Sequence, residues 1–260
     1  MSTELLERRF AAIGASLRVA DGPWLGAPRI DVRAEGRQEH FDLAFAGSGD
    51  PSDATVVDVA PADRHLLLLI RTGGEKSKFL CGHDERHWFV AAIPEAVRGV
   101  TGVQAAKAAL QPPVVALAAE RLRRKRRFDR RNPAYIRQGE WFFVPEPDLR
   151  VDERFVLRNE PLARPQGTPH ILRYAFRRGG TVVYVHGQTG RMIGAADYAR
   201  LFERARRSGS WRQMIRDPEL FARGTVRHPD HATVVLREWH RVLMNTEDGA
   251  RANVHVAFLD

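Results

Sequence analysis

The stretch HILRYAFRRGGTVVYVH, residues 170–186, decides the expected fold. Leu172, Tyr174 and Phe176 alternate with polar or small residues, which is typical of a strand with one buried face. Gly179 and Gly180 stand where a two-residue hairpin loop requires positive φ angles. The stretch therefore predicts a hairpin of two antiparallel strands, 170–178 and 181–186.

Short apolar runs separated by glycine, proline and polar residues continue on both sides of this stretch. They predict strands at 29–33, 40–45, 55–59, 65–71, 141–144 and 154–157, and two further hairpins, 78–81 with 87–93 and 224–228 with 232–243. The expected helices are few and do not alternate one for one with the strands. This pattern favours a β-rich α+β class with several antiparallel hairpins over a doubly wound sheet.

Four helices are expected from apolar spacing and from their end signals. They cover 3–13, a stretch from 101 to about 110 that opens with a Thr101–Gln104 capping box, a stretch from 113 to about 128, and an amphipathic helix at 195–207. The helical, basic segment 101–131 is expected to connect an N-terminal α+β half, 1–100, to a C-terminal α+β half, 132–260, although one single domain is also consistent with the sequence.

Length and composition exclude several classes of protein. The chain has 260 residues, 43% of them apolar, which excludes a disordered protein. Its one cysteine excludes an internal disulfide. No unbroken apolar run approaches the ~20 residues that a membrane span needs. The acidic N-terminus does not resemble a signal peptide, so we expect a cytoplasmic protein without a membrane partner.

The positive charge is concentrated in one short segment. The formal net charge is +9, and residues 121–131 hold eight basic side chains with Asp129 as the only acid, a local charge of +7. The eight are Arg121, Arg123, Arg124, Lys125, Arg126, Arg127, Arg130 and Arg131. Such a cluster indicates phosphate contacts with DNA or RNA. A solvated helix face and a site for an acidic protein are the alternatives.

A second basic surface is expected on the amphipathic helix 195–207. Tyr198, Leu201 and Ala205 repeat at helical spacing and define its apolar stripe. Arg204 and Arg207 lie mostly away from that stripe, so they are expected as secondary phosphate contacts.

Two clusters of histidines carry the remaining chemistry. In the first, a thiol, two imidazoles and two carboxylates are crowded between residues 81 and 87, where 82–86 would form the exposed loop of a hairpin. His83 and His87 are candidate ligands or bases, and Asp84 a candidate catalytic carboxylate. The alternative is a solvated turn with Cys81 packed inward.

The second cluster is His228–Pro229–Asp230–His231. Proline and aspartate at the two central positions suit a type I turn, whose ends lie within roughly 7 Å of each other at Cα. The two imidazoles would then be close enough to share a metal ion. A turn with two solvated histidines is the alternative.

Three functions follow from these patterns. One is nucleic-acid binding through the arginine-rich helix. Another is an adaptor that binds an acidic protein. The remaining one is a metal-dependent hydrolase, such as a nuclease, in which zinc or manganese lowers the pKa of water. Its candidate ligands are His83, His87, His228 and His231, and its candidate catalytic residues are His83, His87, Asp84 and Asp230.

Overall fold

The computed structural model describes residues 2–20, 29–36, 38–45, 53–72, 74–163, 168–208, 210–247 and 256–258. The chain forms two compact units. The first comprises 1–141 with the short returns 230–232 and 244–250, and the second comprises 142–229, 233–243 and 251–260.

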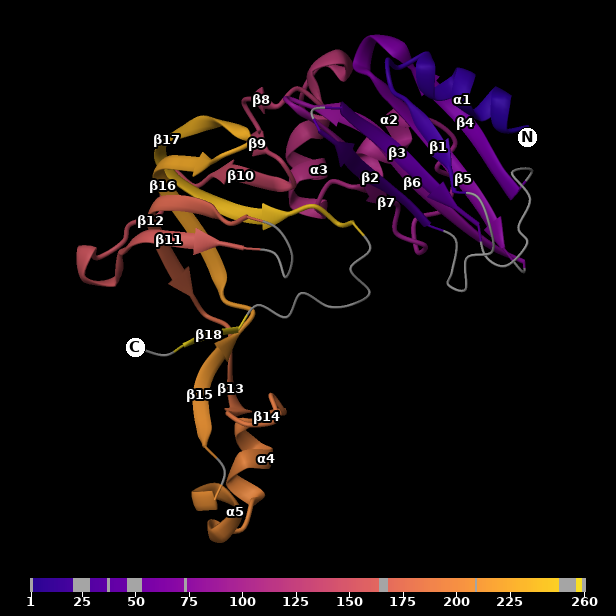
Figure 1. Cartoon of the computed structure of the whole chain (residues 1–260). Helices are drawn as coiled ribbons and strands as arrows, with labels where there is room; N and C mark the ends of the chain where they lie inside the picture. Colours follow the sequence, from indigo (N-terminus) through magenta and orange to yellow (C-terminus); the bar gives the residue numbers. More distant parts are fainter. Residues whose placement is uncertain are drawn as a thin grey trace. The chain divides into compact units, whose positions relative to one another are not determined.

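Two sheets build the first unit (Figure 1). A three-stranded sheet has the order β1-β3-β2, in which β1 and β3 run parallel and β2 and β3 antiparallel. A four-stranded antiparallel sheet has the order β4-β5-β6-β7. The strands are β1 (Leu17–Val19), β2 (Arg29–Glu35), β3 (Gln38–Ala44), β4 (Ala54–Ala60), β5 (His65–Thr72), β6 (Glu75–Asp84) and β7 (His87–Ala92).

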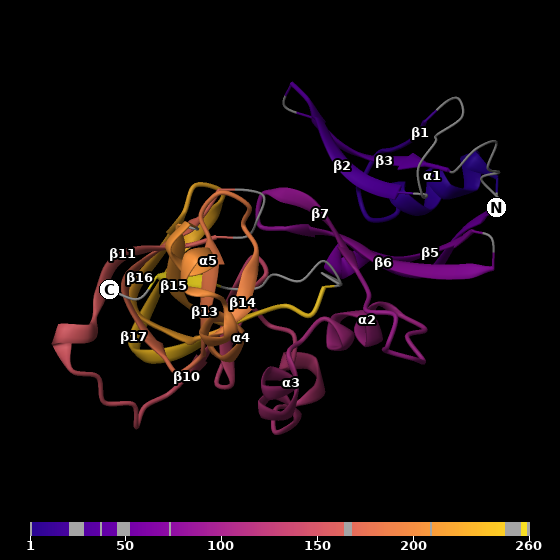
Figure 2. The same cartoon turned by 90° about the horizontal axis from the view of Figure 1, so that it is seen from below.

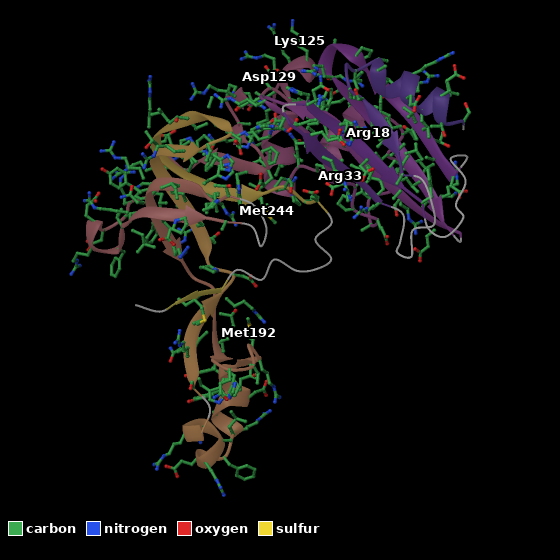
Figure 3. All side chains as sticks on the ribbon, viewed as in Figure 1. Arg18, Arg33, Lys125, Asp129, Met192 and Met244 are labelled. Carbon is green, nitrogen blue, oxygen red and sulfur yellow. The ribbon has the colours of Figure 1, made fainter. Side chains whose placement is uncertain are left out.

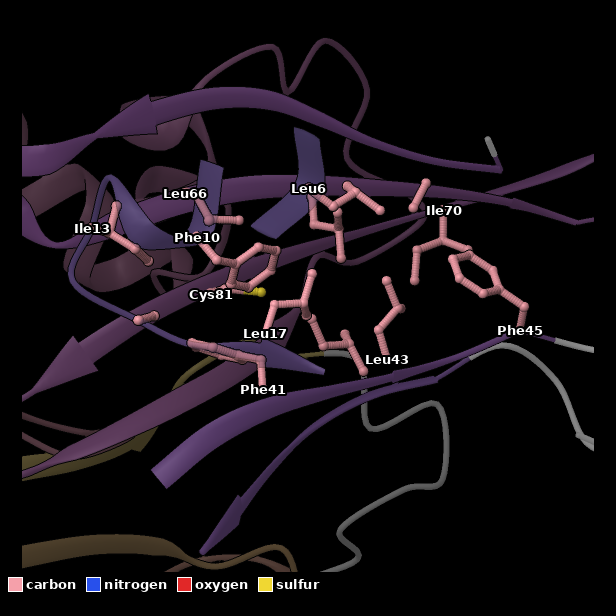
Figure 4. Packing of buried hydrophobic residues seen from close by; sticks show 14 residues of the cluster. Leu6, Phe10, Ile13, Leu17, Phe41, Leu43, Phe45, Leu66, Ile70 and Cys81 are labelled. Carbon is pink, nitrogen blue, oxygen red and sulfur yellow. The ribbon is translucent and has the colours of Figure 1, made fainter. Parts of the chain in front are cut away.

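Helix α1 (Thr3–Ala11) lies between these two sheets, as Figure 2 shows. Its Leu6 and Phe10 are fully buried, and they share one apolar core with Phe41 of β3 and Leu66 of β5 (Figure 4). The rings of Phe10 and Phe41 lie 5.0 Å apart between centroids. The expected helix at 3–13 is therefore confirmed in place, with the α-helix itself ending at Ala11.

Helix α2 (Val103–Ala109) packs on the opposite face of the four-stranded sheet. Leu67 of β5 and Leu80 of β6 point toward it, whereas Leu66 and Leu68 point toward α1. The unbroken apolar run of β5 is explained by this burial on both faces.

The start of α2 differs from the expected capping box. Its N-cap is Gly102, which offers no side chain, and the Val103 N–H donates 2.7 Å to the Asp58 carboxylate at the end of β4. A Cβ at Gly102 would stand 2.8 Å from that Asp58 carboxylate oxygen, so the tertiary cap requires glycine there. The local Thr101–Gln104 cap is therefore wrong.

The expected arginine-rich helix is also wrong in extent. Helix α3 (Pro113–Glu120) ends before the basic residues, and beyond it only a short 3₁₀ turn, Arg124–Arg126, is regular. The Arg127 guanidinium folds back and donates to the carbonyls of Glu120 and Leu122 at the end of α3. If the helix continued, its arginines would lie one turn apart and repel one another. In the observed arrangement, Arg127 instead donates to backbone carbonyls that would otherwise lack a hydrogen-bond partner at the end of the helix. Two short strands, β8 (Arg131–Asn132) and β9 (Tyr135–Gln138), follow as an antiparallel pair.

The sheet of the second unit has the strand order β11-β12-β16-β17-β10. The strands are β10 (Trp141–Pro145), β11 (Leu157–Leu162), β12 (His170–Arg178), β16 (Glu219–His228) and β17 (His231–Met244). The expected strand at 154–157 is displaced, because Glu153–Phe155 forms a 3₁₀ turn that precedes β11.

The hairpin predicted at 170–186 has the expected strand bounds but the wrong pairing. Strand β12 pairs with β16, and β13 (Thr181–His186) pairs with β15 (Trp211–Arg216). Arg178 lies opposite Glu219, and Thr181 lies opposite Arg216, so Gly179 and Gly180 form a kink in one long antiparallel ribbon rather than a loop. The outer part of this ribbon projects as an arm from the sheet of the second unit (Figure 1).

The arm carries a small α/β tip that consists of β14 (Met192–Gly194), α4 (Ala195–Arg200) and α5 (Glu203–Ser208), with β18 (Val256–Phe258) pairing along β15. The single amphipathic helix expected at 195–207 is therefore wrong. Leu201 adopts an extended conformation (ψ 138°) that breaks it in two.

The coarse prediction is confirmed, since the structure is β-rich, with several antiparallel sheets and few helices. None of the helices described is long and apolar enough to cross a bilayer.

Candidate metal centre

The turn predicted at 228–231 is present and joins two neighbouring strands. His228 is the last residue of β16 and His231 the first of β17, with Pro229 and Asp230 between them. The hairpin itself therefore keeps the imidazoles of His228 and His231 close, as predicted from the sequence.

A third histidine joins them from the strand on the other side of β16. Ile171 of β12 pairs with Arg227, which places His170 beside His228. The two rings stack with 4.3 Å between centroids and 27° between planes. One ligand nitrogen of His170, one of His228 and one of His231 all lie within 4.8 Å of one another. We call these three residues the histidine triad.

The triad is partly shielded from solvent. His170 is buried, and His228 and His231 are half-buried. The Nε2 atom of His228 lies 3.1 Å from the Thr168 carbonyl, which can accept a hydrogen bond from the neutral tautomer protonated at Nε2, and this tautomer leaves Nδ1 with its lone pair. Metal-binding histidines usually donate their other ring N–H to a carbonyl or carboxylate in this way.

His231 lies near a carboxylate rather than a carbonyl. Its Nδ1 lies 3.5 Å from the Glu85 carboxylate, and its Nε2 faces Gly139. A Cβ built on Gly139 would stand 3.0 Å from that Nε2, so a larger residue at this position would crowd the nitrogen. The triad thus combines three candidate nitrogen ligands with two neighbouring oxygen groups, the Thr168 carbonyl and the Glu85 carboxylate.

The first histidine cluster lies on the hairpin of β6 and β7, with a turn at Glu85–Arg86. His83 packs edge-on against Trp88 at 4.9 Å, and burial together with the Arg64 charge lowers the pKa of His83. Neither His83 nor His87 belongs to the triad. Cys81 is fully buried, and burial raises the pKa of its thiol, so it is a neutral core residue.

His87 lies between two carboxylates. Its Nδ1 is 2.6 Å from Glu39, which also accepts the Trp88 N–H at 2.9 Å, and its Nε2 is 3.8 Å from Asp230. The Glu85 carboxylate accepts the N–H of Ala232 at 2.8 Å. The turn at 85–86 therefore lies next to Asp230 and His231. His87 contacts the Asp230 carboxylate, and His231 contacts the Glu85 carboxylate.

Asp84 and Glu85 are neutralised by arginines. Arg130 contacts both carboxylates, and Arg137 donates to Asp84 at 3.1 Å. Burial lowers the pKa of Arg137, and burial together with the Arg137 charge lowers the pKa of Arg130 to about 10, so Arg130 remains cationic at neutral pH. These contacts occupy Asp84, a candidate catalytic residue, in an ion-pair network.

The basic segment 121–131 is only partly neutralised. Arg126 pairs with Asp129 at 3.6 Å, Arg127 binds backbone carbonyls, and Arg130 binds Asp84 and Glu85. The remaining basic side chains are exposed, and within the described part of the chain they form no salt bridge (Figure 3 labels Lys125 and Asp129). They are Arg121, Arg123, Arg124, Lys125 and Arg131.

His170 was not grouped with the other histidines by sequence. It lies 58 positions before His228, and only the pairing of β12 with β16 brings the two together. No local spacing in the sequence signals this contact.

The chain matches no family model, and comparisons with curated proteins and with solved structures find no significant similarity.

Proposed function

We propose that the protein binds a divalent metal ion, zinc or manganese, through His170, His228 and His231, and that it is a metal-dependent hydrolase. The observation that carries this proposal is the convergence of three imidazole nitrogens within 4.8 Å. Three protein ligands leave the fourth position of a tetrahedral zinc ion open to water, which is typical of catalytic rather than structural zinc sites. The metal would lower the pKa of that water toward neutrality.

The ligand set is consistent with this chemistry. Imidazole nitrogen is a favoured ligand of zinc. The Thr168 carbonyl beside His228 and the Glu85 carboxylate beside His231 would fix the ring orientations, as outer partners do in many metal sites. The proposal replaces the ligand set expected from sequence, His83, His87, His228 and His231, by one that retains only the last two.

The test is metal content. After incubation with excess zinc and gel filtration, the wild-type chain should carry one zinc ion, measured by elemental mass spectrometry. A chain with His228→Ala and His231→Ala should bind zinc at least about 100-fold more weakly, because ligand loss should exceed the 10–100-fold effect of losing an outer partner. Binding should also weaken as the pH is lowered, because protons compete with the metal for the imidazole nitrogens.

His186→Ala is the matched control, because His186 lies on the arm against Trp211 and outside the triad. It should retain the zinc. A wild-type chain that holds neither zinc nor manganese, or a double variant that keeps its metal, would overturn both the metal site and the hydrolase.

Nucleic-acid binding through residues 121–131 is a second candidate function. It is supported by the five basic side chains of this segment that are exposed without a salt bridge. Replacing Arg123, Arg124 and Lys125 by serine should lower the slope of log K against log salt by about 2.7 for a duplex, about 0.9 per lost phosphate contact. Serine at Arg9, Lys76 and Arg98, three exposed cations elsewhere in the first unit, is the matched control. Equal slopes for both triple variants would contradict this function.

A further inference from the structure

The tip of the arm displays a large apolar side chain. Phe202 lies between α4 and α5 and is 85% exposed, more than any other large hydrophobic residue described. An isolated exposed apolar residue is ordinary, but an aromatic ring this open at the end of a projecting arm is a natural contact point.

The tip that presents Phe202 is held together by aromatic packing. Tyr198 of α4 stacks on Tyr184 of β13 with 3.6 Å between centroids and 4° between planes. Trp211 of β15 packs edge-on against Tyr198 at 5.9 Å, and its Nε1 donates to the Ala205 carbonyl at 3.3 Å. The two helices are thus fastened to the ribbon, and Phe202 is carried on an ordered platform.

The surroundings of Phe202 are strongly basic. Residues 195–216 contain six arginines and two acids, a net charge of +4. Arg200 lies 3.6 Å from Asp197, and Arg207 pairs with Glu203, but both guanidinium groups remain largely exposed. Arg204 is exposed and forms no salt bridge with any residue that the structure describes.

We propose that the tip of the arm is a nucleic-acid-binding element in which Phe202 stacks on a base while Arg204, Arg207 and Arg200 contact phosphates. The combination of an aromatic ring with neighbouring cations is what single-stranded nucleic acids bind, because every base has a face to stack and every nucleotide a phosphate. An anionic membrane would be a different partner. A single ring offers it little apolar area, whereas one ring is sufficient for one base.

This element is distinct from the histidine triad and from the basic segment 121–131. It does not require the metal-dependent hydrolase, and it adds a second surface to the nucleic-acid contact considered above. The proposal can therefore fail without either of the proposed functions failing.

The experiment is fluorescence anisotropy with a labelled 20-nucleotide single strand and with a duplex of the same sequence. Phe202→Ala should weaken single-strand binding about 5- to 160-fold, the range that corresponds to the loss of one base-stacking aromatic. Phe155→Ala is the matched control, because Phe155 is 63% exposed on the 3₁₀ turn before β11, away from the tip. It should leave the affinity unchanged, and circular dichroism should show both variants folded.

The same pair of variants is then measured in the chain with Arg123, Arg124 and Lys125 replaced by serine. A loss of affinity at Phe202→Ala in this background supports a separate site on the arm. Equal affinities of the Phe202→Ala and Phe155→Ala variants in both backgrounds overturn the proposal, as does a Phe202 effect seen only with phosphatidylserine vesicles. An affinity lost only through the serine substitutions would leave the second candidate function standing and reject the arm.

Discussion

Asp84→Ala is expected to lower the free energy of unfolding by about 3 kcal/mol, because it leaves two partly buried arginines without their shared carboxylate. Asp84 contacts Arg130 and accepts from Arg137 at 3.1 Å, and only 14% of its side chain is exposed. Removing one partner of such a network costs more than the network contributes, since the remaining charges stay desolvated. Urea denaturation followed by tryptophan fluorescence measures the change.

The control is Asp129→Ala, which removes an exposed partner of Arg126 at 3.6 Å. Exposed pairs of this kind contribute between 0 and about 1 kcal/mol. A loss at Asp84→Ala no larger than that at Asp129→Ala would show that the network is weak. It would also return Asp84 to the residues available for catalysis.

Gly180→Ala is expected to destabilise the second unit by about 3 kcal/mol or more, through a clash and through backbone strain. A Cβ at Gly180 would lie 2.4 Å from the Ile215 side chain and 2.8 Å from the Arg216 carbonyl oxygen on the facing strand. The residue also has φ +91°, a region in which a Cβ costs about 1–2 kcal/mol. Overpacking adds a further ~1–3 kcal/mol.

Gly179→Ala separates the two causes. Gly179 also has a positive φ, +67°, but a Cβ there meets nothing within 4 Å, so only the cost of about 1–2 kcal/mol remains. Thermal unfolding of the two variants measures the difference. Equal losses would contradict the close approach of the two strands at the kink.

For the segment that contains these two glycines, the sequence predicts strands but not the strands with which they pair. Alternation in residues 170–178 correctly predicts the first of the two strands, because a half-buried strand needs that pattern whatever its partner. It does not specify the partner. A Gly-Gly pair suits a tight loop and a kink equally, and the pairing with β15 and β16 depends on residues 211–228, far along the chain.

The predicted ends of two helices, α3 and α4, were wrong for a related reason. The apolar spacing that starts α3 continues past Glu120, but the helix stops where arginines would stack on one another and where Arg127 can satisfy its last carbonyls. At α4 the break at Leu201 leaves the Arg206 guanidinium donating to the Leu201 carbonyl at 2.9 Å. Both endings depend on side chains returning to the backbone, which apolar spacing does not report.

The candidate site was predictable in part. The turn at 228–231 is local, and proline followed by aspartate indicates it directly. His170 is contributed by strand pairing, so only the fold identifies it as the third member of the triad. The contact of His87 with Asp230 likewise joins residues that are distant in sequence, and neither histidine cluster contains a pattern that predicts it.

The carboxylate that caps α2 has a consequence for how the chain assembles. Asp58 precedes Val103 by 45 residues, so during synthesis β4 leaves the ribosome well before the helix does. With Gly102 as its own N-cap, the helix has a weak local start, and it gains its cap only after the sheet has formed. We therefore expect helix α2 to form after the sheet, so that substitutions in α2 should change the unfolding rate of the first unit more than its folding rate.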